Sequence, residues 1–137
     1  MKHSVLMLTG LLSLVVTPAL AGDDHERISP EALHMLQQND GAPLVLDVRS
    51  REEVQEEGRV PGAVVVPHDE MPERLDELAG HEDETVVLYC ASNRRAGIAA
   101  ETMEEHGFEQ ISFLEGAFPG WRDAGKPVEE VSSEPTP

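Results

Sequence analysis

Cysteine is almost absent from the sequence: the 137 residues include only Cys90. A single thiol cannot form a disulfide within the chain, and it has no second thiol for dithiol exchange. In an oxidising compartment a lone thiol is a liability, because it can be overoxidised or can pair with another molecule. Its presence therefore favours a use for it.

Positive charge is also scarce. The chain has 10 lysine and arginine residues against 27 aspartate and glutamate residues, which gives a formal net charge of −17. Nucleic acids and anionic membrane surfaces attract proteins through clustered positive charge, so neither is an expected partner. The acidity is typical of a solvated surface that keeps a protein soluble. We expect small-molecule partners and a monomer.

Long apolar runs are missing except for one mostly apolar stretch from Val5 to Val16. It is shorter than the ~20 residues needed to cross a bilayer. Lys2 precedes it, and Ala19-Leu20-Ala21 follows with the small-x-small pattern that signal peptidase reads. The sequence predicts that residues 1–21 are a signal peptide, removed from a periplasmic or secreted protein. An uncleaved membrane anchor is the alternative.

The histidines lack the spacing of metal ligands, both among themselves and relative to Cys90. We therefore expect no metal and no other cofactor. His68 follows Pro67 in a predicted loop, and a lone histidine without a placed partner is more often a loop or surface residue than a catalytic base.

Apolar periodicity, turn residues and two helix caps, Ser29 as an N-cap and Ser50 with Glu53 as a capping box, divide the remaining chain into short strands and helices. Predicted helices cover residues 30–39, 51–57, 71–78, 96–106 and 116–124, and predicted strands cover residues 44–46, 64–66, 85–89 and 111–114. The alternation predicts one α/β domain of three layers over residues 28–128, with a mainly parallel central sheet of about five short strands flanked by helices. Residues 22–27 are predicted to be a polar lead-in, and residues 129–137 a disordered tail rich in acidic residues, serine and proline.

Cys90 begins a predicted six-residue loop between the strand at 85–89 and the next helix, and Arg94 and Arg95 end it. A loop that enters a helix N-terminus directs backbone N–H groups at one spot, and the helix dipole adds positive charge there. Asn93 tolerates the positive φ that a tightly curled loop needs. The pattern predicts an anion-binding loop, residues Ala91 to Arg95, that holds Cys90 as a thiolate nucleophile. An ordinary buried thiol is the alternative.

Asp47 and Arg49 lie at the end of the predicted strand at 44–46. Ligands of open parallel sheets sit at the carboxyl ends of strands, so this end and the end of the strand before Cys90 can face the same crevice. An ion pair that only pins the loop to the strand remains an equally good interpretation.

Four sequence motifs follow one another in an order and spacing that resemble the single-domain rhodanese-like sulfurtransferases. In one-letter code they are LDVR at 46–49, GRVPGA at 58–63, YCASNRR at 89–95, and EGAFPGW at 115–121 followed by GKP at 125–127. The resemblance implies that Cys90 takes a sulfane sulfur from a donor such as thiosulfate and passes it, as a persulfide, to cyanide or a thiol. It also implies that Asp47 and Arg49 brace the site.

Arg59 stands where members of this family commonly carry histidine, and we expect it to be exposed rather than to add positive potential at the crevice. Two other classes stay open. One is a non-catalytic binding or sulfur-carrier module. The other is a phosphatase of related fold, although the loop from cysteine to arginine is one residue longer there than between Cys90 and Arg95.

Overall fold

The structure, a computed structural model, describes residues 25–132. Its centre is a five-stranded sheet in the order β1-β5-β4-β2-β3, with every neighbouring pair parallel. The strands are β1 (Glu26–Ile28), β2 (Leu44–Asp47), β3 (Val64–Val65), β4 (Val86–Tyr89) and β5 (Ile111–Leu114). The predicted α/β class with a mainly parallel sheet is therefore confirmed, and the sheet is wholly parallel.

Between residues 25 and 132, four α-helices connect the strands and a fifth follows β5: α1 (Pro30–Gln38), α2 (Arg51–Glu57), α3 (Met71–Arg74), α4 (Arg94–Glu105) and α5 (Ala117–Asp123). Short 3₁₀ turns, η1 (His68–Glu70) and η2 (Leu75–Leu78), flank α3. Both predicted caps are present, because the Ser29 side chain accepts from the Ala32 amide and Ser50 forms a capping box with Glu53. The helix predicted at 71–78 divides at Leu75 into α3 and η2.

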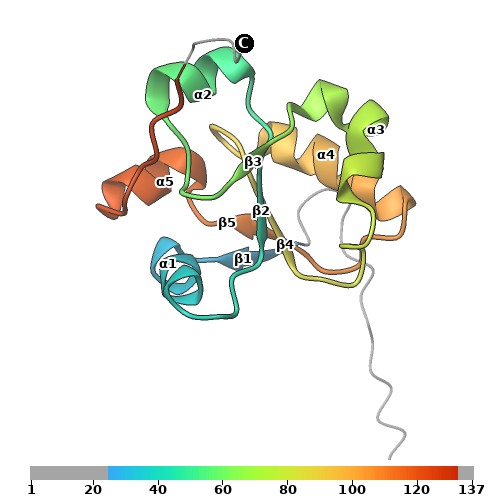
Figure 1. Cartoon of the computed structure of the whole chain (residues 1–137), viewed down its shortest axis with the longest axis horizontal. Helices are drawn as coiled ribbons and strands as arrows, with labels where there is room; N and C mark the ends of the chain where they lie inside the picture. The colour runs from blue at the N-terminus through green and yellow to red at the C-terminus, as the bar shows by residue number, and fades with distance from the viewer. Residues whose placement is uncertain (1–24, 133–137) are drawn as a thin grey trace, which may run out of the picture.

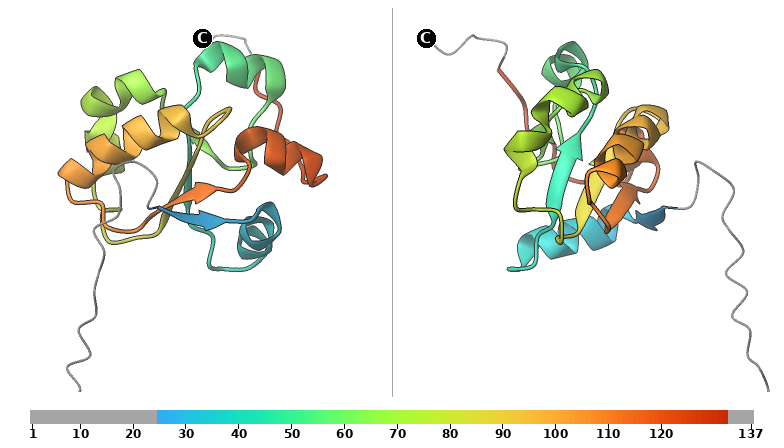
Figure 2. Two further views of the ribbon diagram at one scale, coloured as in Figure 1. Left: turned by 180° about the vertical axis from the view of Figure 1, so that it is seen from behind. Right: turned by 90° about the vertical axis from the view of Figure 1, so that its right-hand side faces the viewer.

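Helices cover both faces of the sheet. Figure 1 shows α1 and α5 on one side of it and α3 and α4 on the other, and Figure 2 shows the same layers from behind and from the side. Neighbouring residues of a strand point to opposite faces, so Leu88 joins the cluster under α3 and α4 while Val87 joins the cluster under α1 and α5. All four residues of β4 are buried. This explains why β4 reads as a continuous apolar run.

Parallel pairing brings the carboxyl ends of β2 and β4 to one edge of the sheet. Asp47 pairs with Tyr89 in register, and the Val48 amide donates to the Tyr89 carbonyl oxygen over 3.0 Å. The residues that follow these strands, Arg49 and Cys90, therefore leave the sheet at the same edge, as the sequence predicted.

Two predictions about the ends of the domain are wrong. Glu26 and Arg27, expected in a polar lead-in, form β1, which pairs with β5 at the sheet edge. Glu129, expected in the disordered tail, exchanges two backbone hydrogen bonds of 2.9 and 2.8 Å with Arg59. Residues 1–21 lie outside the described residues, so the signal peptide stays a prediction. Between residues 25 and 132, no helix has the length and apolar character to cross a bilayer.

Candidate active site

A tight loop joins β4 to α4 and opens with Cys90. Asn93 adopts a left-handed conformation with φ of 66°, as its residue type predicted. Helix α4 begins at Arg94, two residues earlier than predicted, and Gly107 follows its C-cap with φ of 96°. The loop therefore consists of residues 90–93, and Arg94 and Arg95 lie in the first turn of the helix rather than in the loop.

The side chain of Asn93 holds the loop in place. Its Oδ1 accepts from the Cys90 amide over 3.3 Å, and its Nδ2 donates to the Leu114 carbonyl oxygen over 2.7 Å. These bonds tie the loop to the end of β5. The sequence predicted only the backbone conformation of Asn93, because nothing in it marked residue 114 as a neighbour.

The backbone N–H groups of residues 91–96 have no acceptor among residues 25–132. The first N–H groups of any helix lack intrahelical partners, and Asn93 makes no side-chain cap here. Together with the positive end of the helix dipole, they favour an anion at the loop.

The thiol of Cys90 is enclosed. The residue is 0% exposed and belongs to the apolar cluster under α4, whereas Ala91 and Ser92 are exposed above it. The sequence predicted a nucleophile and left an ordinary buried thiol as the alternative, and the burial itself agrees with the second interpretation. A donor can reach this sulfur only when the loop or a covering side chain moves.

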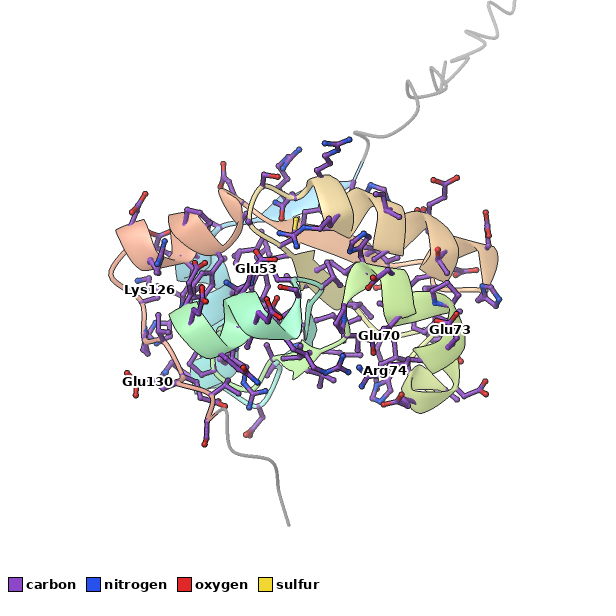
Figure 3. The ribbon with its side chains drawn as sticks, turned by 90° about the horizontal axis from the view of Figure 1, so that it is seen from above. Glu53, Glu70, Glu73, Arg74, Lys126 and Glu130 are labelled. Carbon is purple, nitrogen blue, oxygen red and sulfur yellow. The ribbon has the colours of Figure 1, made fainter. Side chains whose placement is uncertain are left out.

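Arg95 lies beside this thiol and is bonded to α2. Its Nη1 donates to Glu53 Oε1 over 2.5 Å and its Nη2 to Glu53 Oε2 over 2.9 Å. The Arg95 bonds are the main reason that the pKa of Glu53 falls to about 2. Glu53 raises the pKa of Arg95 most, and Cys90 is a further group that raises it. Figure 3 shows Glu53 on the edge of α2 that faces this loop.

Arg94 and Arg95 therefore differ in their pairing, although the sequence predicted the same role for both, as cations of the anion-binding loop. The charge of Arg95 is matched by Glu53, whereas Arg94 is exposed and has no ion pair or hydrogen bond from its guanidinium within the described part of the chain. Glu53 is a site residue for which the sequence indicated only a place in a helix cap.

Asp47 and Arg49 form a buried ion pair. Arg49 Nη2 donates to Asp47 Oδ2 over 2.6 Å and Nε to Asp47 Oδ1 over 3.0 Å, with side chains 1% and 0% exposed. Arg49 also donates to the Gly58 carbonyl oxygen over 2.6 Å and lies 4.1 Å above the centre of the Phe118 ring. Burial disfavours the charged form of Arg49, but the bonds to Asp47 outweigh it, so the pKa of Arg49 is raised. The pair joins β2, the turn at Gly58 and α5.

The sequence predicted that Arg59 is exposed, and this prediction is wrong. Arg59 is half-buried, and its guanidinium is bonded to the Glu129 carboxylate, which also accepts from the Gly62 amide over 3.0 Å. Both bonds lower the pKa of Glu129, and the bond from the Gly62 amide has the larger effect. Arg59 therefore fastens the C-terminal segment to the turn at residues 58–62.

The fold and loop define a class: an α/β domain with a parallel sheet whose one cysteine opens an anion-favouring loop at a strand end. The rhodanese-like domain matches residues 29–124 of the chain. The chain belongs to the rhodanese-like domain family.

Comparisons with individual proteins agree on the family and differ in what the relatives are said to do. YrkF of Bacillus subtilis, a candidate sulfur carrier, is 36% identical over 96 residues, which are 70% of this chain and 49% of that protein. The crystal structure of thiosulfate sulfurtransferase from Pseudomonas aeruginosa has a TM-score of 0.68 at 26% identity, covering 79% of this chain and 21% of that one.

A structure from Rhodopseudomonas palustris, described as a possible tyrosine phosphatase, has a TM-score of 0.67 at 27% identity and covers 77% of this chain and 85% of that one. The chain spans 49%, 58% and 59% of the length of three curated relatives that it matches. Family membership therefore supports a sulfurtransferase type of function without fixing the activity.

Proposed function

We propose that the protein transfers sulfane sulfur from thiosulfate, or a similar donor, to a small thiophilic acceptor through a persulfide on Cys90. One observation carries the proposal: the only thiol of the chain opens a loop whose amides lack acceptors among the described residues, beside the positive group Arg95. An anionic sulfur at this position would gain hydrogen bonds from these amides and a favourable charge.

The reaction consists of two displacements at sulfur. The Cys90 thiolate attacks the outer sulfur of thiosulfate, the sulfur–sulfur bond of the donor breaks, and sulfite leaves with the bonding electron pair. Cyanide then attacks the terminal sulfur of the persulfide, which yields thiocyanate and restores the thiolate. The amides of the loop stabilise the negative charge that stays on the protein sulfur in both steps.

Enclosure of Cys90 bears on the kind of partner. A thiol with no exposed surface is protected from oxidation to higher acids, and it admits small reactants more readily than bulky ones.

We also propose that the protein acts after export, in a periplasm or outside the cell. The support for this is the signal-peptide pattern of residues 1–21.

The test uses the purified chain without residues 1–21 and reads both half-reactions. After incubation with thiosulfate, intact-protein mass spectrometry should show a gain of about 32 mass units, and subsequent cyanide should remove it and yield thiocyanate. Cys90→Ser should do neither. If the wild type gains no sulfur but hydrolyses a generic phosphate ester, the proposal is wrong and a phosphatase is favoured.

A sulfur carrier is the second candidate, and the likeness to YrkF favours it. A carrier would gain the same sulfur once and hold it, with little turnover of thiosulfate and cyanide. Steady-state release of thiocyanate at many equivalents per protein would exclude a pure carrier.

A further inference from the structure

Helix α4 begins with an arrangement that is unfavourable by itself. Arg94 and Arg95 occupy its first two positions, and its first turn contains no acidic residue. Cations at a helix N-terminus face the positive end of the dipole, which destabilises the helix. A nearby anion would offset that cost. Arrangements that break a local rule tend to occur at functional sites.

For Arg95 the anion belongs to the protein itself. Both terminal nitrogens of its guanidinium bond to Glu53, which is held in turn by the amide and hydroxyl of Ser50 over 3.3 and 3.0 Å. Because the pKa of Glu53 is about 2, its carboxylate stays charged at neutral pH. A donor could bond to Arg95 in the same way only by displacing this carboxylate.

For Arg94 the described chain supplies no anion. We infer that Arg94 binds the sulfonate end of the donor and determines the preference for highly charged donors, while Glu53 withdraws Arg95 from that role. The inference rests on the proposed sulfur transfer. It replaces the equal roles that the sequence predicted for the two arginines.

Two donors that differ by one negative charge show whether Arg94 acts through the charge of the donor or affects the reaction in general. Thiosulfate, a dianion, transfers its outer sulfur to the thiolate and leaves as sulfite. Methanethiosulfonate, a monoanion, transfers its outer sulfur in the same way and leaves as methanesulfinate. In both reactions the thiolate becomes a persulfide anion and the leaving group takes the electron pair, so charge and atoms balance.

The experiment measures the second-order rate constant of persulfide formation in single turnovers at low ionic strength. Arg94→Gln should lower the constant for thiosulfate by about tenfold and that for methanethiosulfonate by about threefold, since each negative charge of the donor near an exposed cation contributes a factor of about three. The matched control is Lys126→Gln, which removes one positive charge just beyond the C-terminal end of α5 (Figure 3). It should change neither constant more than twofold.

A second variant tests the withdrawal of Arg95. In an Arg94→Gln background, Glu53→Gln frees the guanidinium while glutamine still suits the capping box. Thiosulfate reactivity should recover by threefold or more. A retained thermal midpoint in Arg94→Gln would show that the lost reactivity does not come from a damaged fold.

The outcomes distinguish the role inferred for Arg94 from the proposed sulfur transfer itself. If Arg94→Gln and Lys126→Gln have the same effect on both donors, or if freeing Arg95 restores nothing, the inference is overturned while the sulfur transfer stands. If the wild type takes sulfur from neither donor, the proposed function fails and the inference fails with it.

Discussion

Replacing Asp47 by asparagine should destabilise the domain strongly, because it leaves the buried charge of Arg49 without its partner. The side chain of Arg49 is 1% exposed, and after the change its remaining partners are the Gly58 carbonyl oxygen at 2.6 Å and Glu57 Oε1 at 3.7 Å. Removal of one member of a buried ion pair costs about 3–5 kcal/mol. We expect about 3 kcal/mol here, since one hydrogen-bond acceptor and one nearby carboxylate remain.

The single tryptophan makes the measurement simple. Trp121 is 0% exposed, so its fluorescence reports the opening of the core under α5. With a urea dependence of about 1–2 kcal/mol per molar for a small domain, the midpoint of unfolding should fall by roughly 1.5–3 M. A domain of this size has a total stability of about 5–15 kcal/mol, so the variant should still fold in water, with a reduced margin.

The matched control replaces both partners, Asp47→Leu with Arg49→Met. Exchange of a whole buried pair for apolar residues is often neutral, so this double variant should unfold at higher urea than Asp47→Asn. The reasoning is refuted if Asp47→Asn shifts the midpoint by less than about 0.5 M, or if the double variant is the less stable of the two.

Three further predictions concern other contacts. The carboxylate of Glu53 contributes stability fully above about pH 4.5 and loses it as the pH falls toward its folded pKa of about 2. The urea midpoints of wild type and Glu53→Gln should therefore converge below pH 4, and parallel profiles would contradict this. Gly58→Ala should cost more than Gly80→Ala by about 1–3 kcal/mol in urea unfolding. Both glycines have positive φ, but only at Gly58 would a Cβ atom clash, with the Val128 side chain and with the Glu129 carbonyl oxygen at 2.9 Å. Equal costs would contradict this. Tyr89→Phe should lower the free energy of unfolding by about 1–3 kcal/mol in the same assay, because the Tyr89 hydroxyl accepts from the buried Val60 amide over 2.9 Å. An unchanged stability would show that this amide finds another acceptor.

The sequence predicted the elements whose signal is local. Strands β2, β4 and β5 are buried on both faces and so appear as apolar runs, and Ser29 and Ser50 mark the helix starts by their side chains. Strand β1 carries no such signal, because Glu26 and Arg27 are exposed and the strand is ordered by its backbone bonds to β5. The order of Glu129 likewise depends on a partner 70 residues away.

At the candidate site the sequence predicted the position of Cys90 and the loop conformation but not the pairing of charges. The left-handed Asn93 follows from its residue type, and the position of Cys90 follows from the end of the apolar run before it. The bond between Glu53 and Arg95 spans 42 residues and two helices, and the capping box already explained Glu53. Because the capping box accounts for Glu53 locally, the sequence did not indicate its second role as the partner of Arg95.

The same pairing bears on the choice between sulfur transfer and phosphate ester hydrolysis. An arginine that binds a phosphate dianion does so with two parallel N–H groups of its planar fork. Both terminal nitrogens of Arg95, which stands at the arginine position closing the loop from Cys90, are already bonded to the Glu53 carboxylate. A phosphate would have to displace a carboxylate that is fully charged at neutral pH, in a loop one residue shorter than the phosphatase loop. A single sulfur atom on Cys90 needs only the amides and the nearby positive charge, so the geometry favours sulfur as the transferred group.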